Sequence, residues 1–186
     1  MFLSLQNLGS LAVFMAVVVG GGIAIGLLTS PGEWYADLRK PWFNPPNWIF
    51  GPVWTVLYIF IAFVGWRLWH IVSGSLAMKL WYAQLLLNFA WSPVFFVAHR
   101  IGTALGIITL LFITIAAFII TVSIQDWVSA LLFLPYAIWV GFALALNGAI
   151  LSLNARHQGY LSSVFSTCCS RGSKHSFDDP KLYRGI

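Results

Sequence analysis

Residues 101–124 read IGTALGIITLLFITIAAFIITVSI, a continuous apolar run without a charged side chain. A membrane-spanning helix needs roughly 20 such residues, because the hydrocarbon core is about 30 Å thick and a helix rises about 1.5 Å per residue. A strand of an outer-membrane barrel would instead be about ten residues of alternating polarity. Backbone groups in lipid must be hydrogen-bonded within the protein, so we predict a transmembrane α-helix over this run.

Four further apolar runs surround this one, and the predicted fold is an all-α integral membrane bundle of five transmembrane helices. The 186-residue chain is 60% hydrophobic and only 8% charged, against about 25% charged in a soluble domain. This composition excludes a soluble enzyme domain and a disordered chain. We expect the bundle to occupy residues 1–153 and a polar, disordered tail to follow at 154–186, with the spans at 8–28, 48–66, 80–98, 101–124 and 127–153.

Basic residues are distributed unequally between the two sides of the predicted bundle. Lys and Arg are enriched on the cytoplasmic side of membrane proteins. The loop at 29–47, the turn at Arg100 and the tail carry eight of the ten, and the opposite side carries Arg67 and Lys79. This places the first loop and the C-terminus in the cytosol. The formal net charge of +5 is then explained by a basic tail, and no nucleic-acid partner is expected. The first basic residue is Arg39, so we expect a retained first helix rather than a signal peptide.

Aromatic residues make up 17% of the chain. Trp54, Trp91 and Trp139 lie beyond a simple interfacial belt, inside spans or near their ends. Rigid rings at such positions either pack the helices together or line a cavity for a flat apolar ligand. The first loop carries Pro41, Pro45 and Pro46, which should hold it extended and stiff, like a lid.

Polar and small residues inside the spans also need an explanation. Gln84 and Asn88 are four residues apart and therefore share a helix face. They and Asn147 are expected to form interhelical hydrogen bonds or to contact a ligand. Gly22 and Gly26 form a small-xxx-small pair that permits close helix approach, in a dimer or within the bundle.

Residues suited to acid–base or metal chemistry are few. No acidic residue lies within a predicted span, the four His are scattered over loops and tail, and no motif of a hydrolase, nucleotide-binding loop or zinc protease occurs. We therefore expect no catalytic residue and no metal site. Cys168 and Cys169 are expected to be free thiols, with palmitoylation as the alternative.

Four ordered motifs resemble the translocator protein family, also called tryptophan-rich sensory proteins (TspO/MBR). The resemblance covers about residues 24–154 and falls in the first loop and in the second, third and fifth spans. The motifs are Trp34-Tyr35-x-x-Leu38-x-Lys40-Pro41 with Asn44-Pro45-Pro46-x-Trp48, Phe50-Gly51-Pro52-Val53-Trp54-Thr55-Val56-Leu57-Tyr58, Gln84-Leu85-x-x-Asn88-x-x-Trp91-Ser92-Pro93-x-Phe95-Phe96, and Pro135-Tyr136-x-x-Trp139-x-x-Phe142-Ala143-x-x-Leu146-Asn147.

The resemblance implies a five-helix bundle, often a homodimer, with a ligand cavity opening under the first loop. It implies a bacterial envelope membrane or a mitochondrial outer membrane as the location. Family members bind tetrapyrroles such as protoporphyrin IX, in some cases also cholesterol and synthetic benzodiazepine-type ligands, and no covalent cofactor is implied. The implied ligand-binding residues are Trp34, Trp48, Trp54, Tyr58, Asn88, Trp91, Trp139, Ala143, Leu146 and Asn147.

Three functions follow from the resemblance. The leading expectation is a receptor-like membrane protein that binds tetrapyrroles for sensing, sequestration or transport. The first alternative is an enzyme that degrades bound porphyrin in light and oxygen, with Trp54 and Trp139 as radical partners. The second is a cholesterol or sterol transporter. Gly148 follows Asn147 where the vertebrate-type sterol motif needs a nearby Tyr, and no ionisable group lies at mid-membrane, which counts against this second alternative.

Overall fold

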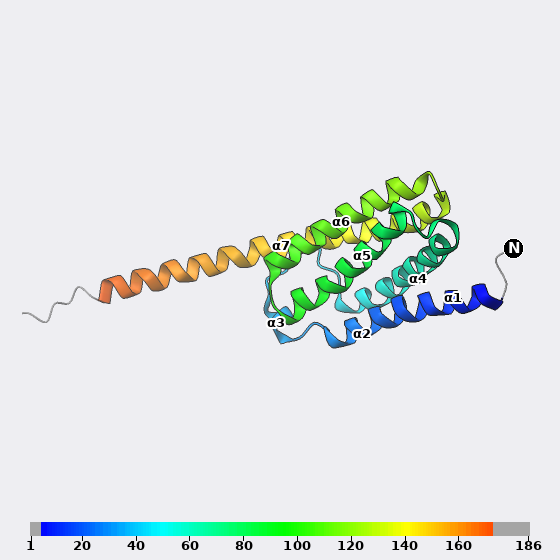
Figure 1. The fold of residues 1–186 in the computed structure, drawn as a ribbon. Helices are drawn as coiled ribbons and strands as arrows, with labels where there is room; N and C mark the ends of the chain where they lie inside the picture. Colours follow the sequence, from blue (N-terminus) through cyan, green and yellow to red (C-terminus); the bar gives the residue numbers. More distant parts are fainter. Residues whose placement is uncertain (1–4, 173–186) are drawn as a thin grey trace, which may run out of the picture.

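The computed structural model describes the backbone of residues 5–172 and the side chains of residues 8–155. In this part of the chain every regular element is helical, and long helices pack side by side into one bundle (Figure 1). In chain order the elements are α1 (Leu5–Met15), η1 (Ala16–Gly20), α2 (Gly21–Leu28), α3 (Glu33–Asp37), α4 (Asn47–Val72), α5 (Leu76–Ser92), η2 (Pro93–Val97), α6 (Ile101–Ser123) and α7 (Trp127–Gly172).

Five helical stretches are long and apolar enough to cross a membrane, which confirms the predicted fold class. They are Leu8–Leu28, Asn47–Val72, Leu76–Val97, Ile101–Ser123 and Trp127–Ala155. The second is longer than predicted, because aromatic and polar residues beyond the apolar core, such as Trp69 and His70, continue the helix. The third begins earlier than predicted, at Leu76, where the Ser75 side chain caps the helix by accepting from the Met78 amide. The first span combines α1, η1 and α2, and it is the least buried of the five.

The last helix differs from its prediction. It does not end near residue 153 but continues as α7 to Gly172, so residues 154–172 are helical rather than a disordered tail. The chain has no proline between Pro135 and Pro180, and only a proline would strongly disfavour helix at these positions. The extension projects beyond the bundle (Figure 1). The prediction for residues 173–186 lies outside the described residues, as do the side chains of Cys168 and Cys169.

Two turns of π-helix interrupt the spans. The second, η2, begins at Pro93, which has no N–H to donate to the preceding turn. The Ala98 amide donates to the Pro93 carbonyl oxygen at 2.9 Å, five residues back, which closes the wider π-turn. Such turns often occur at functional sites, and this one carries Phe95 and Phe96.

Close packing of the helices depends on two glycines. A Cβ at Gly65 would overlap the Trp81 ring of α5, whose Nε1 donates to the Ile61 carbonyl oxygen of α4 at 2.9 Å. A Cβ at Gly22 would likewise overlap the ring of Tyr58. Of the small-xxx-small pair Gly22 and Gly26, the first glycine therefore allows α2 to pack closely against α4 within the bundle.

The loop between α2 and α4 covers one end of the bundle. It was predicted to be extended throughout, but it contains the short helix α3. Asn154 of α7 binds the backbone of Arg39 twice, donating to its carbonyl oxygen at 3.1 Å and accepting from its amide at 3.2 Å. Tyr35 of α3 donates from its hydroxyl to Asn44 Oδ1 at 3.1 Å. These bonds fasten the loop over the helix ends.

An ion pair closes the opposite end of the bundle. Arg67 of α4 donates from Nε and Nη2 to the two carboxylate oxygens of Asp126, both at 2.9 Å. Ser129 donates a third bond to this carboxylate. Burial raises the pKa of Asp126, but the bonds from Arg67 and Ser129 and the guanidinium charge lower it more, and the net pKa lies below the ordinary value of 3.8.

Candidate ligand-binding cavity

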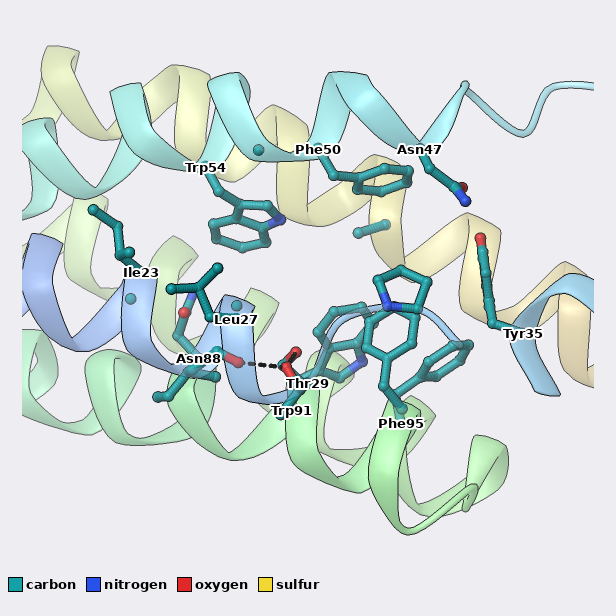
Figure 2. A pocket seen from close by; sticks show the side chains of 18 of the residues that line it. Ile23, Leu27, Thr29, Tyr35, Asn47, Phe50, Trp54, Asn88, Trp91 and Phe95 are labelled. Atoms are coloured by element: carbon teal, nitrogen blue, oxygen red, sulfur yellow. Dashed lines mark hydrogen bonds between the residues drawn. The ribbon is translucent and has the colours of Figure 1, made fainter. Parts of the chain in front are cut away.

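A cavity of about 510 Å³ lies between α2, α4, α5 and α7, under the loop that contains α3 (Figure 2). Its wall is mostly apolar and aromatic, with a few amides and hydroxyls. The lining residues are Gly22, Ile23, Ile25, Gly26, Leu27, Thr29, Pro31, Tyr35, Asn47, Phe50, Gly51, Trp54, Thr55, Tyr58, Asn88, Trp91, Ser92, Phe95, Phe96, Ala143, Leu146, Asn147 and Ile150.

Aromatic rings form two facing walls of the cavity. Figure 2 shows Phe50 and Trp54 on α4 across from Trp91 near the end of α5 and Phe95 of η2. Trp91 and Phe95 stack with their ring centroids 5.4 Å apart. Trp54 stacks on Tyr58 at 5.5 Å. The rings hold one another in place, so the cavity is a largely pre-formed aromatic slot.

A buried polar network forms the inner end of the cavity. Tyr58 donates from its hydroxyl to Asn88 Oδ1 at 2.9 Å, and Asn88 Nδ2 donates to the Tyr136 hydroxyl at 2.8 Å. Tyr136 in turn donates to Gln84 Oε1 at 2.9 Å. Gln84 and Asn88 therefore share one face of α5 and bond across helices, which confirms that prediction. Among the described residues, Gln84 Nε2 has no hydrogen-bond partner.

Further polar groups lie nearer the loop, and they are also bonded. Trp91 Nε1 donates to Asn147 Oδ1 at 3.2 Å, and Asn147 Nδ2 donates to the Ile101 carbonyl oxygen at 3.1 Å. The hydroxyls of Thr29 and Ser92 lie 2.6 Å apart. These bonds orient most of the polar groups of the cavity, whose surface is mostly apolar.

Seven of the ten residues predicted to bind a ligand line the cavity, namely Trp54, Tyr58, Asn88, Trp91, Ala143, Leu146 and Asn147. Their role in binding stays a prediction. The other three lie elsewhere. Trp48 is 74% exposed. Trp34 stacks on His99 at 4.2 Å and meets the edge of Phe95. Trp139 lies behind Phe50, at 5.8 Å between ring centroids, and its Nε1 has no partner among the described residues.

The residues that α2 and the loop contribute to the cavity were not among the predicted ligand-binding residues. Gly22 and Gly26 line the cavity from the first span, Thr29 from just past its end, and Tyr35 from α3. The glycine pair was recognised as a close-packing signal, but a packing motif does not show that one glycine borders empty space. Phe50 and Phe95 also line the cavity; both stand in the quoted motifs, which was the available signal.

Formal charge is confined to the mouth of the cavity. None of its lining residues is Asp, Glu, Lys, Arg or His. At the mouth, Lys40 Nζ lies 4.7 Å from the centre of the Tyr35 ring and donates to the Ala36 carbonyl oxygen at 2.9 Å. Burial raises the pKa of Tyr35, while its bond to Asn44 lowers it less, so this phenol is neutral at physiological pH.

These features define an integral, multi-pass membrane protein with a small-molecule-sized aromatic cavity beneath its first loop. Residues 13–153 match the TspO/MBR family, and the chain belongs to that family. Among its relatives are "Protein CrtK" of Rhodobacter capsulatus, 35% identical over 153 residues (80% of this chain, 95% of the relative), and the "Tryptophan-rich sensory protein" of Cereibacter sphaeroides, 36% identical over 135 residues (73% and 85%). The human "Translocator protein" is 37% identical over 122 residues (62% and 71%).

Proposed function

We propose that this membrane protein binds a tetrapyrrole such as protoporphyrin IX, without covalent attachment, for sensing, sequestration or transport. The aromatic, uncharged cavity is the observation that carries the proposal. Its volume of about 510 Å³ lies within the range of about 300–1,000 Å³ typical of small-molecule sites. The names of the relatives, sensory and translocator proteins, fit a protein whose task starts with capture of a ligand.

The arrangement of charge suits a flat macrocycle with acidic side groups. The apolar ring stacks against Trp54 and Trp91 in the slot, where burial of aromatic surface supplies the affinity. Carboxylates would be costly to bury without a partner, and the cavity wall offers none. They stay at the mouth, near the exposed Arg39 and the partly buried Lys40 of the loop.

Titration of the purified protein in detergent tests this proposal. Protoporphyrin IX is added while tryptophan quenching and porphyrin absorbance are recorded. Wild type should saturate at micromolar ligand. Ala143 is buried in the cavity wall, so Ala143→Phe fills the slot and should weaken binding at least tenfold. Ala145 is exposed on the same helix, so Ala145→Phe is the matched control and should bind like wild type. Quenching that rises linearly, or equal affinity in both variants, would refute the cavity as the binding site.

Degradation of porphyrin in light and oxygen is a second candidate, favoured by the position of Trp54. This ring borders the cavity, stacks on Tyr58 and meets the edge of Tyr136 at 6.3 Å. The saturated complex is illuminated in oxygenated buffer, and porphyrin absorbance is followed. A degrading enzyme bleaches the porphyrin faster than detergent alone and loses this activity in Trp54→Phe but not in the same-helix control Trp69→Phe. Equal bleaching with and without protein leaves binding as the function.

A further inference from the structure

The cavity is not closed on its lipid-facing side, between α2 and α4. Gly26 of α2 and Gly51 of α4 both line the cavity, and both are exposed. A Cβ built on either glycine would meet no atom within 4 Å. The two helices therefore leave open space at this level. Each helix has a glycine, which carries no side chain, at the edge of this space.

The same helix pair is closed deeper in the membrane. One helical turn before Gly26, Gly22 is buried against the ring of Tyr58. Gly26 lies two residues from the end of α2 and Gly51 four residues from the start of α4, so the gap is roughly 3–6 Å inside the loop-side ends of the helices. At this depth we expect the gap to face the outer part of the acyl chains rather than water.

The rim of this gap is compatible with apolar molecules. Ile23 and Leu27 are 48% and 76% exposed, yet both also line the cavity. Figure 2 shows both side chains at the edge of the cavity, and we expect their exposed surfaces to contact lipid. Thr55 is the polar residue on the α4 side, and its hydroxyl donates to the Gly51 carbonyl oxygen at 2.9 Å. Passage across this rim exposes no unbonded hydroxyl to an apolar ligand.

The helix that forms one side of the gap is also the one held least firmly. The first span is the least buried of the five, and it carries the π-helical turn η1 and the run Gly20-Gly21-Gly22. Few side chains have to separate for α2 to move away from α4. Segments with few buried contacts open at low free energy.

We propose that the gap between α2 and α4, bordered by Gly26 and Gly51, is a lateral portal through which the apolar ring of a bilayer-dissolved ligand enters the cavity. The proposal rests on the proposed function, in that it takes the cavity as the binding site. It deepens that function by assigning the source of the ligand: the hydrocarbon phase of the membrane, not the aqueous phase above the loop.

If the gap is the portal, narrowing it with larger side chains should slow ligand entry and release. Gly26→Leu, Gly51→Leu and their combination place side chains in open space, so they should fold like wild type. The proteins are reconstituted in phosphatidylcholine vesicles and mixed with vesicles loaded with protoporphyrin IX, and quenching is followed by stopped flow. Association and release should both slow at least tenfold in the double variant, whereas a variant that only weakened binding would release the porphyrin faster. Gly20→Leu, also exposed with open space around it but outside the cavity lining, should match wild type. An unchanged association rate in the double variant would overturn the portal.

A second measurement needs no porphyrin. Brominated acyl chains quench tryptophans that lipid can reach, and the contribution of Trp54 is obtained by difference from Trp54→Phe in each background. An open portal predicts that Trp54 is quenched in wild type and protected in the double leucine variant. Equal quenching in both would contradict the portal even where porphyrin binding fails, so the two proposals fail separately. Gly26→Ala and Gly51→Ala should give intermediate protection.

Discussion

Replacing Asp126 with asparagine removes the carboxylate that joins α4 to the start of α7. Asp126 has a side chain only 6% exposed and receives two bonds from Arg67 and one from Ser129. In Asp126→Asn the guanidinium loses its counter-charge, and one of its donors faces an amide NH2. We expect the folded bundle to be destabilised, because a partly buried cation is left without its partner.

The magnitude follows from the burial of the two groups. Removal of one partner of a fully buried ion pair costs about 3–5 kcal/mol, and since the Arg67 side chain is 22% exposed, hydration lowers the expected loss to about 2–3 kcal/mol. For a chain of this size each kcal/mol corresponds to about 2–4 °C, so Tm should fall by roughly 4–12 °C. Thermal unfolding in detergent at pH 7 measures it. Asp37→Asn, which neutralises an exposed loop carboxylate, is the control.

The same pair predicts a pH dependence with a definite sign. The pKa of Asp126 in the folded state lies below 3.8, so the folded protein binds this proton less readily than the unfolded chain. The stabilisation is therefore complete above the unfolded pKa and is lost as pH falls through the folded value. The difference in Tm between wild type and Asp126→Asn should shrink below pH 3.8. A Tm loss under 2 °C at pH 7, or a difference that persists in acid, would refute this account of the ion pair.

Two further predictions concern helix packing and the loop. Gly22→Ala places a Cβ against the Tyr58 ring and should lower the free energy of unfolding by about 1–3 kcal/mol through overpacking. Thermal unfolding measures this loss, and Gly20→Ala, which places its Cβ in open space, is the control. Equal Tm values for the two variants would contradict the close contact. Asn154→Ala removes both hydrogen bonds to the Arg39 backbone. Amide hydrogen exchange in the loop should become severalfold faster while Tm changes little. Unchanged exchange in the loop would show that other contacts hold it in place.

The five spans could be predicted from the sequence because crossing a membrane imposes one strong requirement, a long apolar run, on each. The ends of the helices could not. Trp69 and His70 continue α4 beyond its apolar core, and α7 continues to Gly172, since polar residues outside the membrane neither forbid nor require a helix. An irregularity at Pro93 was foreseeable because proline has no N–H to donate, but the sequence does not show that the turn closes through a bond from Ala98 to the Pro93 carbonyl oxygen, five residues back.

The cavity could be predicted only in part, for a geometric reason. Residues four apart on one helix face share surroundings, so Asn88 was correctly placed in a polar network from its spacing to Gln84. The presence of a tryptophan does not by itself show which way its side chain points. Trp54 faces the cavity, whereas Trp139 packs behind Phe50 and Trp48 faces outward. Which side of α4 and α7 borders empty space is set by the neighbouring helices, and α2 in particular contributes glycines that no aromatic pattern marks.

The absence of formal charge from the cavity wall has a consequence for energetics across the bilayer. Moving one elementary charge through the membrane voltage involves about 2.3 kcal/mol per 100 mV, but a porphyrin whose ring enters past Gly26 and Gly51 while its carboxylates stay at the cavity mouth moves no charge across the bilayer. Occupancy of the cavity should therefore follow the concentration of ligand in the lipid and be indifferent to whether the membrane is energised.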